Sequence, residues 1–93
     1  MGDEPWLEFL RVPSMSAGLY RLPKGTQDPQ EPHREDEAYV ILEGRATLDV
    51  DGERVAVGPG SIVFVPANSD HRFTDIQEDL LSLVVFAPAE TEG

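Results

Sequence analysis

The sequence predicts a single all-β domain, arranged as a sandwich or a barrel. Three observations support this fold class. The chain has 93 residues, which is enough for one domain with a modest core. Its 8 glycines and 8 prolines favour short elements separated by many turns. Short apolar segments recur at regular spacing, and no stretch of ~11 residues or more follows the period of a helix.

The first half of the chain contains two predicted strands and then a long polar loop. Residues Trp6 to Val12 and Ser14 to Leu22 are apolar enough to form short strands, and the turn Pro23-Lys24-Gly25 stops the second one. The polar stretch GTQDPQEPHRED follows, with prolines inside it. Because proline restricts the preceding residue to extended conformations, we expect a loop or an irregular strand there.

The second half reads as a series of short strands joined by turns. Residues Glu37 to Asp49 are apolar and β-branched but are interrupted by Glu43-Gly44, which predicts two strands and a tight turn. Asp51-Gly52 is a strong hairpin signal, and Gly58-Pro59-Gly60 predicts another turn. The remaining predicted strands are Ser61 to Val65, His71 to Asp75 and Leu80 to Phe86.

These elements predict one domain over residues 1–93, with its core at about 14–87. The polar tail, residues 88–93, is expected to be flexible, as chain ends are unless something ties them down. Residues 1–12 contain Trp6, Leu7 and Phe9, which are more apolar side chains than a solvated arm requires. They either close the chain's own barrel or contact a second copy of the chain.

Charge and cysteine content exclude several classes of partner and of chemistry. The chain carries 7 basic and 18 acidic residues and no cysteine, with a formal charge of -11. This charge disfavours nucleic acids and anionic membrane surfaces, which are polyanions. No apolar run approaches the ~20 residues that span a bilayer, and the N-terminus lacks the features of a signal peptide. We therefore expect a cytoplasmic protein with no disulfides.

The two histidines are the main candidates for chemistry. His33 and His71 lie near the starts of predicted strands, and imidazole is the commonest protein metal ligand. Glu37 follows His33 by four residues, and even spacing in an extended segment places both side chains on one face. Glu31 shares that parity, whereas Gln30 shares it only if the chain bends. The alternative is an exposed ion pair between His33 and Glu37, which stabilises little.

Two segments resemble the sequence motifs of the cupin family. The segment PHREDEAYVILEG resembles the first motif, a histidine, three residues, a glutamate, six residues and a glycine, at His33, Glu37 and Gly44. The segment GSIVFVPANSDHRFTD resembles the second motif, at Gly60, Pro66 and His71. The resemblance implies a cupin jelly-roll β-barrel, also called a double-stranded β-helix.

The second segment departs from the motif at two positions. The turn position that is usually glycine holds Asn68, a residue that tolerates the left-handed conformation. The closing asparagine of the motif falls on Asp75.

The resemblance also implies one divalent metal ion in the barrel. Cupins usually hold it with two histidines and a glutamate of the first motif and a histidine of the second, which here match His33, Glu37 and His71. The other first-motif histidine falls on Glu31, so that carboxylate, the Gln30 amide oxygen or water completes the coordination. Such a set suits Fe, Mn, Ni, Zn or Cu.

Strand parity suggests the wall of a pocket around this site. Alternation from Glu37 directs Tyr39 inward, and alternation from His71 directs Phe73 inward. Tyr20 and Phe64 are further candidates for the wall. The alternative for all four is ordinary core packing, which overlaps with a pocket wall in a small barrel.

Two functions fit this set of residues. One is a metal-dependent enzyme acting on a small organic molecule, by a dioxygenase-like or an isomerase/lyase-like reaction. The other is a non-catalytic module that binds a sugar or another small ligand, and a third possibility is a barrel that has lost its metal. Because an early strand of cupins often joins the sheet of a partner, the resemblance also implies a homodimer with residues 1–12 in the contact.

Overall fold

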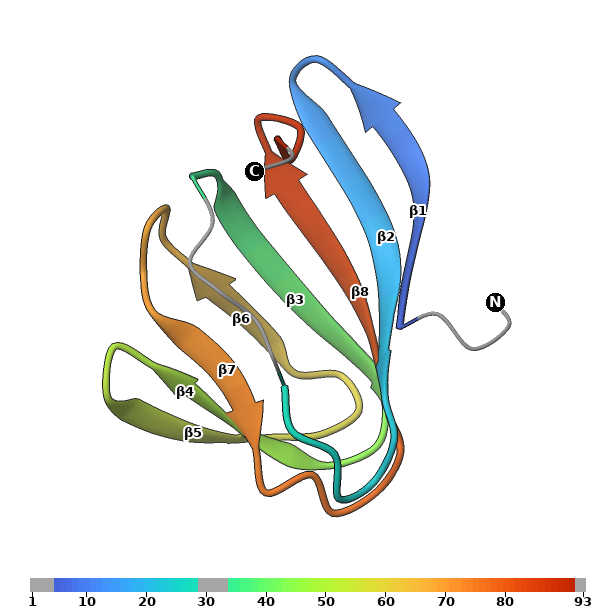
Figure 1. Ribbon diagram of the computed structural model, residues 1–93, viewed down its shortest axis with the longest axis vertical. Coiled ribbons are helices and arrows are strands. Elements are labelled where there is room, and N and C mark those ends of the chain that lie inside the picture. Colours follow the sequence, from blue (N-terminus) through green and yellow to red (C-terminus); the bar gives the residue numbers. More distant parts are fainter. Residues whose placement is uncertain (1–4, 29–33, 92–93) are drawn as a thin grey trace.

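Antiparallel strands form the regular structure of the residues described, 5–28 and 34–91, which confirms the all-β prediction. In this computed structural model the strands are β1 (Trp6–Val12), β2 (Met15–Leu22), β3 (Asp36–Glu43), β4 (Ala46–Val50), β5 (Glu53–Val57), β6 (Ile62–Val65), β7 (His71–Thr74) and β8 (Leu80–Ala87) (Figure 1). Each corresponds to a predicted strand, with small differences at its ends. No helix among the described residues is long and apolar enough to cross a membrane.

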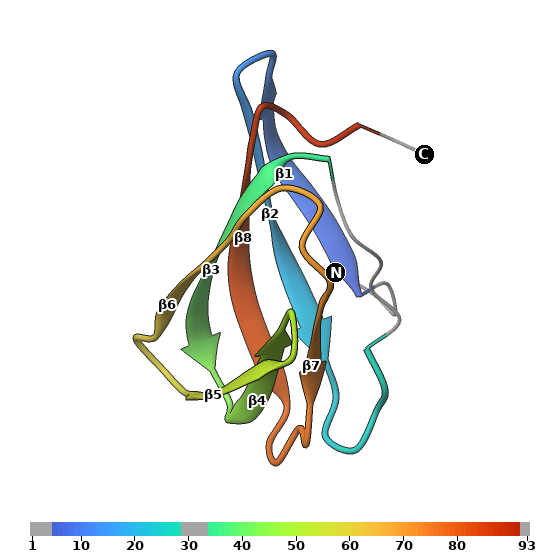
Figure 2. The ribbon, with the colours of Figure 1, turned by 90° about the vertical axis from the view of Figure 1, so that its left-hand side faces the viewer.

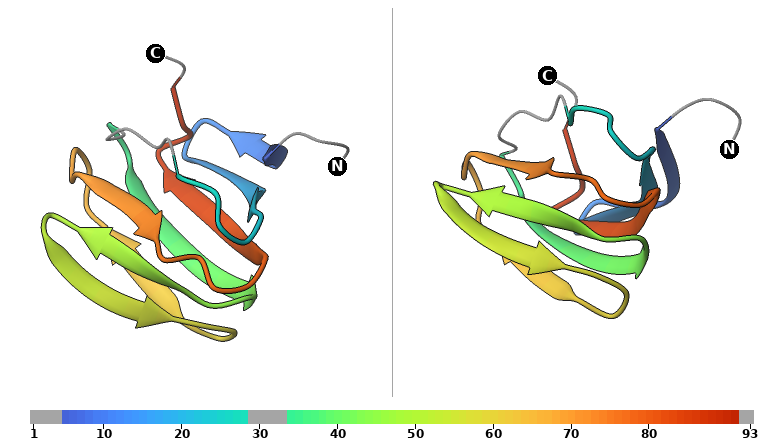
Figure 3. Two further views of the ribbon diagram at one scale, coloured as in Figure 1. Left: turned by 60° about the horizontal axis from the view of Figure 1, so that its bottom comes forward. Right: turned by 90° about the horizontal axis from the view of Figure 1, so that it is seen from below.

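The strands are divided between two sheets that face each other. The larger sheet has the order β1-β2-β8-β3-β6 and the smaller one the order β5-β4-β7. The smaller sheet lies across one face of the larger sheet (Figures 2 and 3). From β3 onward the chain crosses repeatedly from one sheet to the other, which is the connectivity of a jelly roll. The predicted jelly-roll barrel is therefore confirmed.

The core fills the space between the two sheets. Strand alternation directs Tyr39 and Ile41 of β3 and Phe73 of β7 inward, and each is at most 1% exposed. The complete cluster is Tyr20, Leu22, Tyr39, Ile41, Ala46, Leu48, Val57, Val65, Phe73, Ile76, Leu80, Val84 and Phe86. Trp6 of β1 packs its ring edgewise on Phe86 with the centroids 6.0 Å apart. The first strand thus contributes to the chain's own barrel.

Among the described residues, three that are not glycine adopt the left-handed backbone conformation, and two of them, Asp51 and Asn68, lie where turns were predicted. Asn68 has a φ of 65°, which confirms that it takes the conformation usually given to glycine in the second motif. Asp51 has a φ of 50° and Gly52 a φ of 86°, as the hairpin between β4 and β5 requires. Asp75 is the third, with a φ of 48°.

Hydrogen bonds anchor the C-terminal tail as far as Thr91. The Ala89 amide donates to the Pro13 carbonyl oxygen, and the Glu90 amide donates to Ser16 Oγ at 2.8 Å. The amide and the hydroxyl of Thr91 both donate to Glu35 Oε2. The described part of the tail, up to Thr91, is therefore held by hydrogen bonds to β2, to the turn before it and to Glu35.

Candidate metal centre

Glu37 and His71 meet in the interior of the barrel. Glu37 is the second residue of β3 in the larger sheet, and His71 is the first residue of β7 in the smaller sheet. Both strands present these positions to the space between the sheets, and each side chain is 1% exposed. His71 Nε2 lies 3.1 Å from Glu37 Oε1. Two of the predicted ligands, far apart in the sequence, thus come together.

The backbone around His71 fixes the orientation of its ring. The Nδ1 atom lies 2.9 Å from the Ser69 carbonyl oxygen, which can only accept a hydrogen bond. Nδ1 therefore carries the proton of the neutral ring, and Nε2 directs its lone pair toward Glu37. A backbone carbonyl in this role is the usual outer-shell partner of a metal-binding histidine.

The electrostatics of this pair require a positive charge between the two side chains. Burial lowers the pKa of His71, but the hydrogen bond to Glu37, the bond to Ser69 and the charges of Glu37 and Asp28 outweigh it and raise the pKa above 6.5. Glu37 Oε2 is buried and accepts no hydrogen bond from the described residues. A buried carboxylate oxygen without a donor is costly, so the donor set fits a cation that contacts both side chains.

The other predicted ligands, Gln30, Glu31 and His33, lie outside the described residues. Within residues 5–28 and 34–91, no group of three or more histidine, aspartate or glutamate side chains is placed to hold a metal ion. The described part of the site therefore consists of one imidazole and one carboxylate. Their chemistry, nitrogen and oxygen donors, suits divalent first-row metals.

The family model for the cupin domain matches residues 18–86 of the chain. The chain belongs to the cupin family. The match includes Glu37 and His71 and begins within β2, so it covers the part of the barrel that holds the site.

Two further comparisons place this cupin among known proteins. The uncharacterized protein SCO3923 of Streptomyces coelicolor is 49% identical over 89 residues, which are 96% of this chain and 85% of that protein. The crystal structure of the DMSP lyase DddQ from Ruegeria pomeroyi superposes with a TM-score of 0.76 and 28% identity. That likeness covers 82% of this cupin but only 39% of DddQ.

A third comparison concerns the fold alone. KdgF from Halomonas superposes with a TM-score of 0.81 at 20% identity, over 95% of this cupin and 84% of KdgF. The cupin barrel expected from the two motifs is thereby confirmed.

An aromatic side chain, Tyr39, lies beside His71 on the inner side of the sheets and packs on a second one, Phe73. The Tyr39 ring is fully buried, with its centroid 6.1 Å from that of His71 and 4.9 Å from that of Phe73. Tyr20 is 8% exposed and belongs to the same cluster. These three residues lie where a pocket wall was expected, and they also form part of the core.

Phe64 does not lie on the inner side of the barrel. Its side chain is 61% exposed, while the next residue, Val65, is 1% exposed. The pairing of Glu37 with Val65 sets this parity, because paired residues on neighbouring strands point to the same face. The sequence places Phe64 in an apolar strand but does not contain the register of β6 against β3, so the expectation that Phe64 lines the pocket was wrong.

Asp28 is a buried residue near the site that the sequence analysis missed. Its side chain lies in the loop after β2 and is 4% exposed. Tyr20 Oη donates to Asp28 Oδ1 at 2.7 Å, and the Phe73 amide donates to Oδ2 at 2.8 Å. Burial, followed by this hydrogen bond, raises the pKa of Tyr20 far above 10.0, so Tyr20 stays a neutral donor. No local signal marks this aspartate, because it stands in a polar loop.

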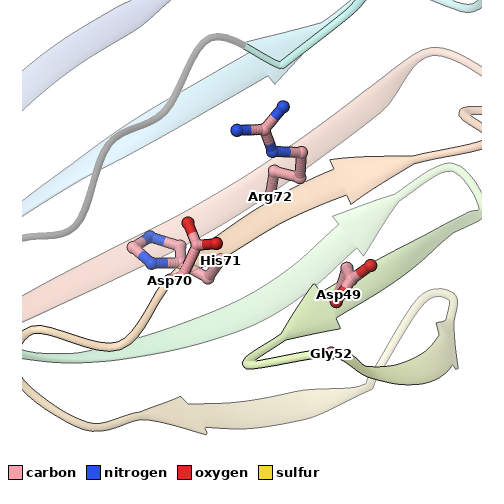
Figure 4. Close-up of a pocket in the computed structure, with 5 residues that line it drawn as sticks. All are labelled: Asp49, Gly52, Asp70, His71 and Arg72. Carbon is pink, nitrogen blue, oxygen red and sulfur yellow. The ribbon is translucent and has the colours of Figure 1, made fainter.

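Two hollows lie beside β7. One, of about 200 Å³, is lined by Asp49, Gly52, Asp70, His71 and Arg72, and Figure 4 shows Arg72 extending in a different direction from the His71 ring. The other, of about 600 Å³, runs between the loop after β2 and β7. Asp28 and Phe73 are among the residues that line the larger hollow, whereas His71 lines the smaller one.

Proposed function

We propose that this cupin binds one divalent metal ion at Glu37, His71 and His33, and that it is a metal-dependent enzyme of the lyase or isomerase type acting on a small organic molecule. One observation supports this most strongly: a buried carboxylate faces a buried imidazole Nε2 at 3.1 Å. The two acceptor groups repel unless a proton or a metal ion joins them. Their place in the barrel matches the ligand positions of the cupin motifs.

The residues around the pair suit proton transfer or hydrogen bonding more than electron transfer. A bound divalent metal would supply Lewis-acid polarisation of a substrate oxygen. Tyr39 is fully buried with its ring beside His71, and Tyr20 keeps its proton because burial and then the hydrogen bond to Asp28 raise its pKa. Glu37 and His71 are themselves shielded from solvent, at 1% exposure each. The likeness to DddQ at 28% identity supports a lyase-type reaction rather than oxygenation.

A non-catalytic binding module is the alternative, and one observation favours it. The position that cupins usually give to a further histidine holds Glu31. A carboxylate there changes the charge and the geometry of the ligand set, which alters the reactivity of a metal more than its binding of a ligand.

Metal titration of the chelator-treated protein tests the proposal. We expect the parent to bind one equivalent of Zn²⁺ or Mn²⁺ with a rise in Tm, and Glu37→Gln and His71→Ala each to weaken affinity at least ~10-fold. Glu53→Gln, an exposed acid on β5, serves as the matched control. Glu37→Gln is isosteric, so it keeps the test valid if His71→Ala unfolds. A parent with no metal-dependent rise in Tm would overturn the proposal.

If the metal is bound, the fate of small substrates separates the two functions. DMSP, the compound in the name of the DddQ lyase, is the first probe. A lyase converts it in the presence of metal and loses this activity in Glu37→Gln. A binding module shifts Tm with this probe but leaves it chemically unchanged.

We also propose that the active form is a homodimer built on the outer face of the larger sheet. We call this surface the outer apolar face. Its exposed members are Leu7, Leu10, Val12, Met15, Leu42, Ile62 and Phe64. Each of these side chains is 37–74% exposed. Contiguous exposed apolar patches mark interaction sites, whereas exposed apolar residues that are scattered singly need no explanation.

A second copy of the chain is the occupant that this surface and the charge distribution favour. The outward positions in the middle of the larger sheet are apolar, and charged ones such as Arg21 and Asp36 stand near strand ends. Two flat apolar sheets can therefore pack face to face while most of the -11 charge of each chain stays in solvent. This contact differs from the exchange of residues 1–12 expected from the family, since β1 pairs with β2 of its own chain.

A further inference from the structure

Two buried carboxylates stand on either side of residues 29–33. Asp28 precedes this segment and Glu35 follows it closely, and each is only 4% exposed. Carboxylates in polar loops are normally solvated, because burying a charge is costly unless donors compensate it. Both residues therefore have a structural reason to be inside, and neither is explained by the metal ligands named above.

Asp28 joins the loop after β2 to both sheets. One carboxylate oxygen accepts from Tyr20 Oη on β2 at 2.7 Å, and the other accepts from the Phe73 amide on β7 at 2.8 Å. Both oxygens are engaged with good geometry, and bonds to a charged acceptor are stronger than neutral ones. The chain is thus fixed at Asp28 against the strand that carries His71.

Glu35 joins the start of β3 to the C-terminal tail. Its Oε2 atom accepts from the Thr91 hydroxyl at 2.9 Å and from the Thr91 amide at 3.3 Å. The tail is itself anchored, since the Glu90 amide donates to Ser16 Oγ at 2.8 Å and Arg11 donates to the Glu90 carbonyl. Glu35 stands two residues before Glu37, so this contact fixes the chain where it enters the site.

We propose that Asp28 and Glu35 are positioning residues that hold the two strands carrying the site, Asp28 through the Phe73 amide of β7 and Glu35 at the entry to β3, so that the metal affinity of the site depends on them and on Thr91. The inference rests on the proposed metal site. Asp28 and Glu35 are not ligands in it, because donors from other elements occupy both oxygens of Asp28 and Oε2 of Glu35. The C-terminal tail thus helps to position the site, because the hydroxyl and the amide of Thr91 both donate to Glu35.

The test compares Asp28→Asn, Thr91→Val and the pair Glu35→Ala and Glu35→Gln with the parent. Titration with Zn²⁺ or Mn²⁺ measures affinity, and trypsin cleavage after Lys24 and Arg34 in the metal-free protein measures how firmly the chain is held at Asp28 and at Glu35. Thr26→Val is the matched control, since it removes a hydrogen bond to the Pro23 carbonyl oxygen in the same loop without touching either carboxylate.

We expect Asp28→Asn, Thr91→Val and Glu35→Ala to weaken metal affinity ~10-fold and to speed cleavage, with Thr26→Val close to the parent. Glu35→Gln keeps an oxygen that can accept from Thr91, so it should recover most of the loss seen in Glu35→Ala. A general loss of packing would lower Tm without this recovery. If Asp28→Asn does not fold, Tyr20→Phe removes one donor and leaves the carboxylate in place.

The two readouts separate this inference from the proposed function. A parent that binds no metal refutes the metal site, while the cleavage rates still decide whether the two carboxylates hold the chain at Asp28 and at Glu35. Faster cleavage with unchanged affinity in Asp28→Asn and Thr91→Val would overturn their role toward the metal. Unchanged cleavage and unchanged affinity in both would overturn the inference as a whole.

Discussion

Glu37 and His71 show how burial turns two ordinary side chains into a coupled pair. At 1% exposure each, neither is solvated, and the 3.1 Å contact between them replaces the lost water. Removing one partner of such a pair leaves the other uncompensated, at a cost of about 3–5 kcal/mol. The same balance explains why a metal ion can be held firmly there: it satisfies both acceptors together.

The titration of His71 should make the stability of the metal-free protein depend on pH. Its pKa in the folded chain is raised, so the protonated ring stabilises the metal-free protein fully below the unfolded pKa of ~6.5 and loses that contribution as the pH rises through the folded pKa. With chelator present, we expect Tm to fall over that range, and His71→Asn should remove this part of the pH dependence. A Tm profile identical in parent and His71→Asn would contradict the assignment.

The metal ion and the proton compete for His71 Nε2, so the metal affinity of the site should also depend on pH. Metal affinity should rise as the pH increases through the folded pKa of His71, since the proton must leave before Nε2 can bind. The metal-bound protein, which carries no proton on Nε2, is then expected to keep its Tm across that range while the Tm of the metal-free protein falls.

At the scale of elements, the sequence contains the strands but only part of their arrangement. The sequence of β3 predicts which of its side chains share one face, so the inward orientation of Glu37 and Tyr39 could be predicted from the sequence alone. The position of His71 followed from the second motif. Phe64 could not be placed, because its orientation depends on how β6 pairs with β3. Asp28 could not be found either, because its donors, Tyr20 and the Phe73 amide, belong to distant strands.

Among the elements, the turn from β3 to β4 should depend on Gly44 for its stability. Gly44 has a φ of 91°, and a Cβ there would collide with the Asp79 carbonyl oxygen and with Leu80 Cα. Gly52 has a φ of 86°, but a Cβ there meets open space. Gly52→Ala should cost ~1–2 kcal/mol from backbone strain alone, whereas Gly44→Ala should cost clearly more. Urea unfolding measures both, and equal losses would show that the backbone contact of Gly44 is unimportant.

In the whole molecule, one face of the larger sheet packs on the core and the other is exposed. The inner face holds the core and the Glu37–His71 pair, and no layer formed by residues 5–28 and 34–91 covers the outer apolar face. Sandwiches usually leave polar residues on the outward face of a sheet. The apolar outward positions of β1 and β6 therefore indicate a covered surface, and the proposed homodimer supplies the cover.

The homodimer gives the last prediction. Replacing both Ile62 and Phe64, which are 74% and 61% exposed on β6, by serine should raise the dissociation constant at least ~10-fold, because apolar area buried in the contact is lost. Val55→Ser on β5 is the matched control, since Val55 is 46% exposed but belongs to the smaller sheet. Sedimentation equilibrium measures the constants. Added salt should tighten the parent dimer, because it screens the repulsion between two chains of charge -11. A parent that stays monomeric at 100 μM, or a Val55→Ser variant as impaired as the double variant, would show that the outer apolar face is not the contact.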